Sequence, residues 1–312
     1  MVGVDWSAAL IPLAAWGLDR LLGEPVRFHP LVGFGRWVDA VERCLYPRAG
    51  GPGRRFAAGL LAWCLLVVPP VAGAAWLQAA LPALLAMAFA VLVLWLALGG
   101  KSLADHARAV EGPLAAGELD AARRAVAHLV SRDAARLDGT GVARAAVESV
   151  LENGSDAVVG SLFWHALAGP AGVVLHRLAN TLDARFGYRS ARYRHFGWIA
   201  ARADDLLNWA PARLTALLYA ASAPRPLSAW RCARRRARLW PSRNAGWAMA
   251  AGAAALGLRL GGPAPYAGAL RRRPLLGRGR MPQAADIGRA TRLVAQSGLA
   301  AALAAALWGA AA

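Results

Sequence analysis

The sequence predicts an all-α, polytopic integral membrane protein with a helical lobe in the cytosol. Of its 312 residues, 57% are hydrophobic, and apolar runs of membrane-spanning length recur along the chain. Between Arg55 and Lys101 there is no Lys, Arg, Asp, Glu or His, which leaves room for two spans joined by a short turn. A soluble fold is the weaker interpretation of this pattern.

The charge and the cysteines exclude several classes of protein. The net charge is +18, and the bases fall between apolar runs, as the positive-inside rule predicts for cytoplasmic loops. No aromatic-interleaved basic module or recognition motif for nucleic acid is present, so we expect no nucleic-acid partner. The three cysteines form no CxxC pair, which argues against a zinc site or a disulfide framework. The N-terminus lacks the pattern of a cleaved signal peptide.

The first elements follow from apolar runs and their flanks. Residues 2 to 18 are predicted to form the first membrane helix, and an amphipathic helix on the cytosolic side should carry Val32 and Trp37. The uncharged run that follows predicts a hairpin over residues 56 to 100, with its turn at residues 78 to 82. Both flanks of the hairpin are basic, so both ends should lie in the cytosol.

The middle of the chain alternates polar and interrupted apolar segments. Residues 101 to 156 are predicted to form the cytosolic helical lobe. Residues 157 to 179 contain Gly169-Pro170 and have basic residues on the far side, so we expect a re-entrant or broken helix. Residues 206 to 222 are also not a simple membrane span, because Arg213 lies in the middle of this apolar run. We expect Arg213 to be buried against protein, headgroups or a ligand.

The last third has two basic stretches between small-residue and apolar segments. The arginine-rich loop at residues 224 to 243 should face anionic lipid headgroups. Residues 244 to 260 are rich in small residues and suit close helix packing, and residues 293 to 312 are predicted to be a final apolar helix. No boundary splits the chain, so we expect residues 1 to 312 to form a single membrane-embedded domain.

Three acids mark the stretch that carries the most chemistry. Glu148, Glu152 and Asp156 are spaced four apart, which places them on one face of a helix. Like charges stacked in this way repel, so a cation or a cationic substrate group would compensate them. The alternative is a solvated helix face, but grouping the acids beside an apolar segment favours a site. Gly154 leaves open whether the helix over residues 142 to 153 continues to Asp156.

One phosphate-binding motif is a false match. Gly100-Lys101-Ser102 resembles the end of a P-loop, but the position of the first glycine is Trp95, and an apolar run stands where the motif needs a strand. Lys101 at the membrane edge could still meet a phosphate.

Polar residues gather beside apolar segments in four places. These are Asp19 to His29; Asp133 to Asp156; Asn180 and Asp183 with nearby arginines; and Asp204, Asp205, Asn208 and Arg213. If they converge, they describe a cytosol-facing cavity with both carboxylates and arginines, suited to a Mg-bound phosphate compound.

At these same residues the chain resembles the adenosylcobinamide-phosphate synthases, a family of cobalamin-biosynthesis membrane proteins. The motifs that carry the resemblance are D-x-x-x-G-E-P from Asp19 to Pro25, His29-Pro30 with Gly33, S-R-D at Ser131 to Asp133, V-E-S-V-x-E-N-x-x-D from Val147 to Asp156, L-F-W at Leu162 to Trp164, N-T-L-D at Asn180 to Asp183, F-G-W at Phe196 to Trp198, D-D-L-x-N at Asp204 to Asn208, P-A-R-L-T at Pro211 to Thr215 and N-A-G-W at Asn244 to Trp247. They are too many, and too well ordered, to be chance.

The resemblance implies a ligase that uses ATP and Mg to join a carboxylate of adenosylcobyric acid to the amine of aminopropanol or its O-phosphate. A carboxylate must be activated before an amine attacks it, so the site must hold Mg-ATP against the acid. On this basis Glu148, Glu152, Asn153 and Asp156 are the expected catalytic residues, with Glu152 and Asp156 as metal ligands and Glu148 or Glu152 as the base. The expected substrate-binding residues are Asp19, Glu24, His29, Lys101, Arg132, Asp133, Asn180, Asp183, Asp204, Asp205, Asn208 and Arg213.

The resemblance also implies a multi-pass protein of the inner membrane whose site faces the cytosol, with other late enzymes of the cobalamin pathway as partners. Two other functions fit the composition. A transporter or permease would also have intramembrane ionisable residues and broken helices, and a lipid-phosphate transferase would also have acidic metal motifs. The polar lobe and the lack of inverted repeats argue against transport.

Overall fold

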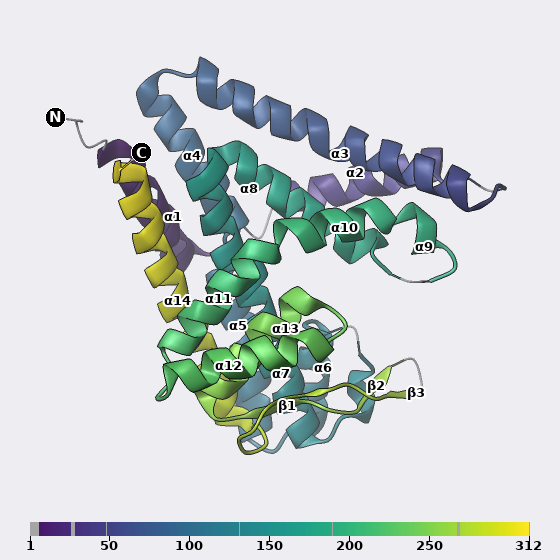
Figure 1. Ribbon diagram of the computed structural model, residues 1–312, viewed down its shortest axis with the longest axis vertical. Helices are drawn as coiled ribbons and strands as arrows, with labels where there is room; N and C mark the ends of the chain where they lie inside the picture. The colour runs from purple at the N-terminus through teal and green to yellow at the C-terminus, as the bar shows by residue number, and fades with distance from the viewer. Residues whose placement is uncertain are drawn as a thin grey trace. The chain divides into compact units, whose positions relative to one another are not determined.

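The computed structural model of the chain describes residues 6–25, 29–47, 49–130, 132–188, 190–266 and 269–311. The described residues are mainly helical (Figure 1). They form two compact units: the first contains Met1–Leu98, Gly160–Asn208 and Ala302–Ala312, and the second contains Gly99–Val159 and Trp209–Ala301. Neither unit is a continuous piece of sequence, which explains why no boundary stands out along the chain.

The first unit is built from helices. They are α1 (Trp6–Leu22), α2 (Pro30–Leu45), α3 (Pro52–Ala80), α4 (Ala83–Ala97), α8 (Gly160–Phe186), α9 (Tyr193–Phe196) and α10 (Trp198–Leu207), together with the end of α14 (Ala284–Ala311). The two predicted arms of the hairpin are α3 and α4, and the helical hydrogen bonding stops at Leu81 and Pro82. The predicted turn is therefore confirmed.

Long apolar helices identify the protein as an integral membrane protein. Four stretches of the described residues are long and apolar enough to cross a bilayer: Pro52–Ala80, Ala83–Ala115, Gly139–Phe186 and Ala284–Ala311. Large apolar side chains on them, such as Trp76, Leu84 and Leu307, are more than two-thirds exposed. A helix that is apolar on its exposed side suits contact with lipid tails. The all-α membrane fold expected from the sequence is thus confirmed.

The predicted broken helix is present within α8. Ala168 (φ −142°, ψ 18°) and Gly169 (φ 57°, ψ −150°) leave the helical conformation directly before Pro170. Proline disfavours the helical conformation in the preceding residue, and glycine tolerates a positive φ. The helix therefore breaks where Gly169-Pro170 predicts.

The core of the first unit holds α8 and α10 in place. Buried side chains from α2, α3, α8, α9 and α10 form one apolar cluster, among them Phe34, Leu66, Leu182 and Phe196. In Figure 1, α2 and α3 run beside each other, in agreement with their packing contacts. This cluster fixes the two helices that carry the acids and amides of residues 176 to 208.

The second unit contains helices and two small sheets. Its elements are α5 (Gly100–Ala115), α6 (Leu119–Ala127), η1 (Ala134–Arg136), α7 (Gly139–Asn153), the π-helix η2 (Gly154–Val159), α11 (Trp209–Ala221), α12 (Pro226–Arg236), η3 (Ala237–Leu239), α13 (Arg243–Leu256), the strands β1 (Arg259–Gly261), β2 (Ala264–Tyr266), β3 (Ala269–Arg271) and β4 (Leu275–Gly277), and most of α14. Strand β1 pairs antiparallel with β4, and β2 pairs antiparallel with β3. These short strands were not predicted.

Two segments of the second unit differ from the sequence-based expectation. The arginine-rich stretch at residues 224 to 243 contains the helix α12 and is not only a loop. The small-residue helix α13 ends at Leu256, because Gly257 adopts the left-handed conformation (φ 67°) and caps it. Strand β1 then begins at Arg259, so residues 244 to 260 are not one helix.

Candidate functional site

The first acid of the predicted stripe, Glu148, is buried among arginines in the second unit. Its side chain is 2% exposed, and its Oε2 accepts hydrogen bonds from Arg132 Nη2 (2.6 Å) and Arg273 Nη1 (3.0 Å). Its Oε1 accepts a hydrogen bond from the Gly261 backbone N–H at 2.7 Å. Two guanidinium groups therefore compensate this carboxylate, where the sequence alone suggested a metal cation or a cationic substrate group.

Three different elements bring this arginine–glutamate cluster (Arg132, Arg144, Glu148 and Arg273) together. Arg132 precedes η1, Arg144 and Glu148 lie one turn apart on α7, and Arg273 lies between β3 and β4. Arg273 stacks over the Trp240 ring (5.1 Å) and donates from Nε to the Gly262 carbonyl oxygen (3.1 Å). The two small sheets thus position Arg273, which lies between β3 and β4, within hydrogen-bond distance of Glu148.

The cluster has unused hydrogen-bond donors. Arg132 Nε, Arg132 Nη1 and Arg144 Nε are buried and have no hydrogen-bond partner among the described residues. Arg144 lies close enough to Arg132 and Arg273 to feel their charge. Buried guanidinium donors without partners are unfavourable, and an anion with several oxygens would satisfy them.

Glu152 and Asn153 follow one turn later on α7. Glu152 lies within electrostatic range of Glu148, Arg132 and Arg273, yet it makes no hydrogen bond or ion pair with another described residue. Asn153 is exposed and donates from Nδ2 to the Ser149 carbonyl oxygen at 2.9 Å. Of the predicted catalytic acids, Glu152 is therefore the one beside the arginines whose carboxylate is still available.

A π-helix separates Asp156 from the other two acids. The chain stays helical past Asn153, but residues Gly154–Val159 form π turns with one more residue per hydrogen-bonded loop than an α-helix. Asp156 lies near Tyr219, whose hydroxyl donates to the Leu151 carbonyl oxygen at 3.1 Å. Burial, and secondarily the Asp156 charge, raise the pKa of Tyr219, which keeps the phenol neutral. The regular spacing of four therefore does not continue unchanged to Asp156.

The first unit holds a second polar group, an acid–amide network on α8 and α10. His176 Nε2 lies 2.9 Å from Asn208 Oδ1, and Asn208 Nδ2 donates to Asp204 Oδ1 at 2.8 Å. Asn180 Nδ2 donates to the same Asp204 oxygen at 3.2 Å. His176 and Asn180 are one turn apart on α8. Asp204 lies on α10 and Asn208 caps the C-terminal end of that helix one turn later, so facing turns of two packed helices form the network.

Two further carboxylates lie near Asp204. Burial raises the pKa of Asp204 to about 7, and the Asp183 and Asp205 charges add to the rise against the hydrogen bonds from Asn180 and Asn208. Asp205 also pairs with Arg202 at 3.2 Å on the exposed side of α10. The structure thus brings together the predicted residues of the N-T-L-D and D-D-L-x-N motifs.

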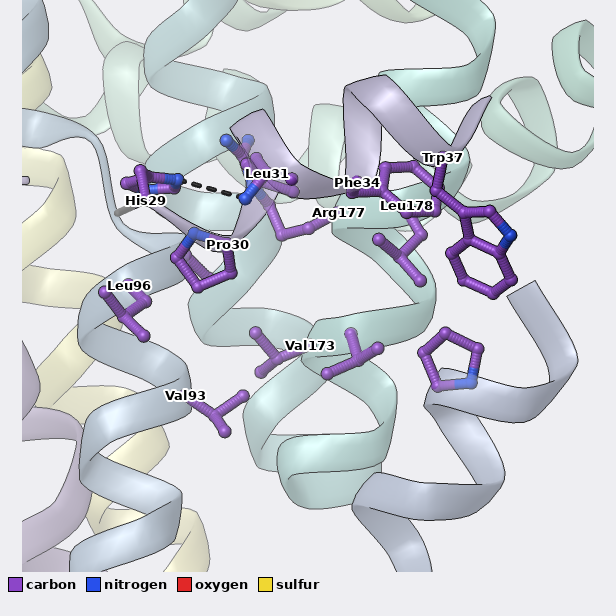
Figure 2. Close-up of a pocket in the computed structure, with 14 residues that line it drawn as sticks. His29, Pro30, Leu31, Phe34, Trp37, Val93, Leu96, Val173, Arg177 and Leu178 are labelled. Carbon is purple, nitrogen blue, oxygen red and sulfur yellow. Dashed lines mark hydrogen bonds between the residues drawn. The ribbon is translucent and has the colours of Figure 1, made fainter. Parts of the chain in front are cut away.

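His29 lines an apolar pocket in the first unit. The cavity of about 400 Å³ lies between α2, α3, α4 and α8, and His29 and Trp37 stand at opposite ends of its lining (Figure 2). His29 caps α2 by accepting from the Leu31 backbone N–H (3.2 Å) through Nδ1, and its Nε2 is buried without a partner among the described residues. Arg177 contributes the other ionisable side chain of the pocket.

The remaining predicted residues have individual surroundings. Asp19 is buried at 2% exposure on α1, and Glu24 is half-buried beyond the turn that ends this helix. Lys101 pairs with Asp105 at 3.1 Å on α5. The backbone N–H of Asp133 donates to the Pro265 carbonyl oxygen at 3.2 Å.

Arg213, in the second unit, has aromatic partners. Its guanidinium lies over the rings of Trp209 (4.2 Å) and Trp247 (5.3 Å) and donates to the Trp209 carbonyl oxygen. Burial lowers the pKa of Arg213, and the Arg243 charge adds to this effect. The rings accommodate a charge that an apolar run alone would not. That Arg213 lines one cavity with the Asp204 group stays a prediction.

Sequence reasoning missed several participants. Arg273 was visible only as part of the run Arg271 to Arg273, and nothing local linked it to Glu148. His176 stands four residues before Asn180, a spacing that could have placed both on one helix face. Among the described residues, no three or more His, Cys, Asp or Glu side chains form a group that could hold a metal ion.

Comparison with known proteins gives the family. The model of the CobD/Cbib protein family matches residues 12–294. The chain belongs to the CobD/Cbib protein family. This match includes every predicted site residue and all four residues of the arginine–glutamate cluster.

Relatives from several bacteria are similar to the chain over nearly its whole length. The cobalamin biosynthesis protein CobD of Chromobacterium violaceum is 55% identical, over 92% of this chain and 92% of the relative. That of Stutzerimonas stutzeri is 54% identical over 92% and 93%, and that of Mycobacterium tuberculosis is 44% identical over 91% and 90%. No solved structure matches the chain.

Proposed function

We propose that the protein acts in cobalamin biosynthesis as a membrane-bound ligase that joins a carboxylate of adenosylcobyric acid to the amine of (R)-1-amino-2-propanol O-phosphate or of aminopropanol. The role in cobalamin biosynthesis is supported by the CobD relatives, which bear that name and align with about nine-tenths of the chain. The observation that carries the reaction class is the placement of Glu152 beside buried arginines with unused donors. An acid–base group beside an anion site is what amide formation from an activated acid requires.

The residues of the second unit fit a phosphate-bearing cofactor. Arg132 and Arg144 present buried N–H donors, and guanidinium groups bind phosphate oxygens in well-defined geometry. Mg usually takes only one or two protein carboxylates and fills its other positions with water and phosphate oxygens. Glu152 and Asp156 supply such carboxylates, and we propose them as its ligands. When bound, Mg-ATP supplies the activation of the substrate carboxylate.

Substrate binding and proton transfer are assigned to residues of the second unit. Glu148 holds Arg132 and Arg273 in fixed positions through its two oxygens. The unused donors of Arg132 then orient an anionic group of the substrate or cofactor. Glu152 either binds Mg together with Asp156 or accepts the ammonium proton, which leaves the amine free to attack. Asn153 and Lys101 are proposed to contact phosphate oxygens from the rim.

We propose further that the protein crosses the inner membrane several times and that this site faces the cytosol. The basic loops between the apolar runs support this orientation. In the first unit, the acid–amide network and His29 stay proposed as substrate-binding residues.

The test is direct formation of the amide. Purified protein is incubated with adenosylcobyric acid, aminopropanol phosphate and Mg-ATP, and the product is followed by mass spectrometry, with reactions that lack ATP, Mg or the amine as controls. We expect a product whose mass equals acid plus amine minus water. Absence of this product with either amine, together with uptake of adenosylcobyric acid into vesicles that contain the protein, would contradict the ligase and favour a permease.

A further inference from the structure

A strongly basic pocket in the second unit shares no residue with the arginine–glutamate cluster. It is a cavity of about 380 Å³ between α12, the end of α13 and the turn after β4. In Figure 1, α12 and α13 run beside each other, in agreement with their packing contacts. Its lining includes Ser228, Arg231, Arg235, Arg236, Arg278 and Gly257.

No acidic side chain balances these arginines. The lining contains no Asp or Glu, and the sequence has none from position 206 to position 285. The four guanidinium groups make no ion pair or hydrogen bond with another residue that the structure describes. Four like charges around one cavity repel each other, and this repulsion is relieved when an anion enters.

The helix α12 presents one face to the pocket and packs with the other. Ser228, Arg231 and Arg235 follow the three- and four-residue spacing of one helix face. Ala229 and Ala233 lie on the opposite side and are almost fully buried. The arginines are therefore held by a packed helix, and they face the cavity together.

Backbone fixes the opposite wall. A Cβ atom on Gly279 would lie 1.6 Å from the Gly257 carbonyl oxygen, so the two segments approach as closely as glycine allows. The Arg280 backbone N–H donates to that same oxygen at 3.2 Å. This contact sets the position of Arg278, one residue before Gly279, opposite α12.

We propose that this pocket binds a phosphoryl group. Guanidinium groups bind tetrahedral oxyanions with paired, charge-assisted hydrogen bonds, and the Ser228 hydroxyl can donate another. The phosphoryl group belongs either to the headgroup of an anionic lipid or to a soluble phosphate compound. Both present the same chemistry to the four arginines, and the proposal is independent of the ligase reaction.

The experiment compares two double variants of equal charge in the full-length protein. Arg231→Gln with Arg235→Gln removes two pocket arginines, while Arg234→Gln with Arg238→Gln removes two exposed arginines of the same segment that do not line the cavity. Each protein is placed in nanodiscs of pure phosphatidylcholine and titrated with pyrophosphate by calorimetry. In a second arm, retention of phosphatidylglycerol from mixed micelles is measured by native mass spectrometry.

We expect the pocket variant to lose about tenfold or more in affinity for at least one of these ligands, with the control variant close to wild type. Loss of pyrophosphate binding identifies a soluble phosphate compound as the occupant, and loss of phosphatidylglycerol alone identifies a lipid headgroup. Equal affinities of the pocket and control variants for both ligands would overturn the proposal.

A variant outside α12 controls for the possibility that the α12 substitutions weaken binding by disturbing the fold of that helix. Arg278→Gln changes the opposite wall, and it should weaken the same ligand while elution volume and circular dichroism stay unchanged. If Arg278→Gln binds that ligand as tightly as wild type, the pocket is not the binding site. Because no substrate of the ligase is present, failure of the ligase assay leaves these results unaffected.

Discussion

At the scale of single residues, the surroundings separate acids that look equivalent in the sequence. Glu148 and Glu152 lie one turn apart on α7, and spacing alone gives them the same expected role. Glu148 is occupied by two arginines and a backbone N–H, whereas Glu152 feels the same charges without a hydrogen bond to them. Two conservative variants test this difference: one is expected to impair catalysis and the other to lower stability.

Glu152→Gln should impair catalysis and leave the fold intact. The amide keeps the size of the side chain and removes the charge, so turnover should fall about 100-fold or more if Glu152 accepts the proton or binds metal. Product formation is measured by mass spectrometry at increasing Mg, since a metal ligand would raise the Mg requirement and a base would not. A variant that makes product at a near wild-type rate would end the case for Glu152.

Glu148→Gln should instead destabilise the protein. It leaves Arg132 and Arg273 buried at 7% and 8% exposure without their counter-charge, and loss of one partner of a buried ion pair costs about 3–5 kcal/mol. Thermal unfolding in detergent should show a large drop in Tm. The control is Asp105→Asn, which breaks solvent-exposed pairs with Lys101 and Arg108 and should change Tm little. Equal effects of the two substitutions would argue against the arginine–glutamate cluster.

The acid–amide network predicts a pH dependence of stability. Because burial and Asp183 raise the pKa of Asp204 from 3.8 to about 7, the native state keeps a proton that the unfolded chain releases. This contribution to stability is fully present below the unfolded pKa and is lost as pH rises toward 7. Asp204→Asn stays neutral and should flatten the fall in Tm between about pH 5 and about pH 8. The surface variant Asp205→Asn should keep more of the slope, and an unchanged slope in Asp204→Asn contradicts the assignment.

At the scale of elements, local chemistry predicted the helices and their breaks. The uncharged run predicted α3 and α4, and Gly169-Pro170 predicted the break in α8, because these signals act within a few residues. The strands between residues 259 and 277 escaped prediction, since each has only three residues and β1 is held by pairing with β4 on the far side of the β2–β3 hairpin. The π-helix was not predicted either, because its residues pack against α11 and α14, which lie much later in the sequence.

Gly154→Ala tests that packing. A Cβ atom would lie 2.6 Å from Val294 Cγ2 and 2.7 Å from the Tyr219 hydroxyl oxygen, both of them buried side chains. Overpacking of this kind costs about 1–3 kcal/mol, so Tm and turnover should both fall. Gly112→Ala is the matched control, because its Cβ would meet nothing within 4 Å and alanine favours a helix. Equal stability of the two variants would show that the π-helix tolerates a larger residue.

At the scale of the whole molecule, contacts between distant segments limit what the sequence can predict. Glu148 and Arg273 are 125 positions apart, and each compact unit combines separate segments of the chain. Hydrophobic patterning does not report such pairings, because it depends only on nearby residues. The motifs did predict the polar residues themselves, including Asn180, Asp204 and Asn208, but not that His176 would join them.

Orientation in the membrane is the property of the whole molecule that charge patterning does predict. The helices α3 and α4 are uncharged beyond Arg55, and basic residues flank them, so the positive-inside rule places their connection outside and α5 in the cytosol. Ala80 ends α3, Ala115 ends α5, and both are exposed. A cysteine at either position should therefore report which side of the membrane it occupies.

The test introduces one cysteine at a time into a chain whose three native cysteines have been replaced by serine. Because Cys44 is exposed, it would otherwise react with the probe. A maleimide that cannot cross the membrane should label Ala80→Cys in intact cells, and it should label Ala115→Cys only after the membrane is permeabilised. Labelling of Ala115→Cys but not of Ala80→Cys in intact cells would reverse the orientation. The arginine–glutamate cluster belongs to the same unit as α5, so that result would also argue against a ligase supplied with ATP from the cytosol.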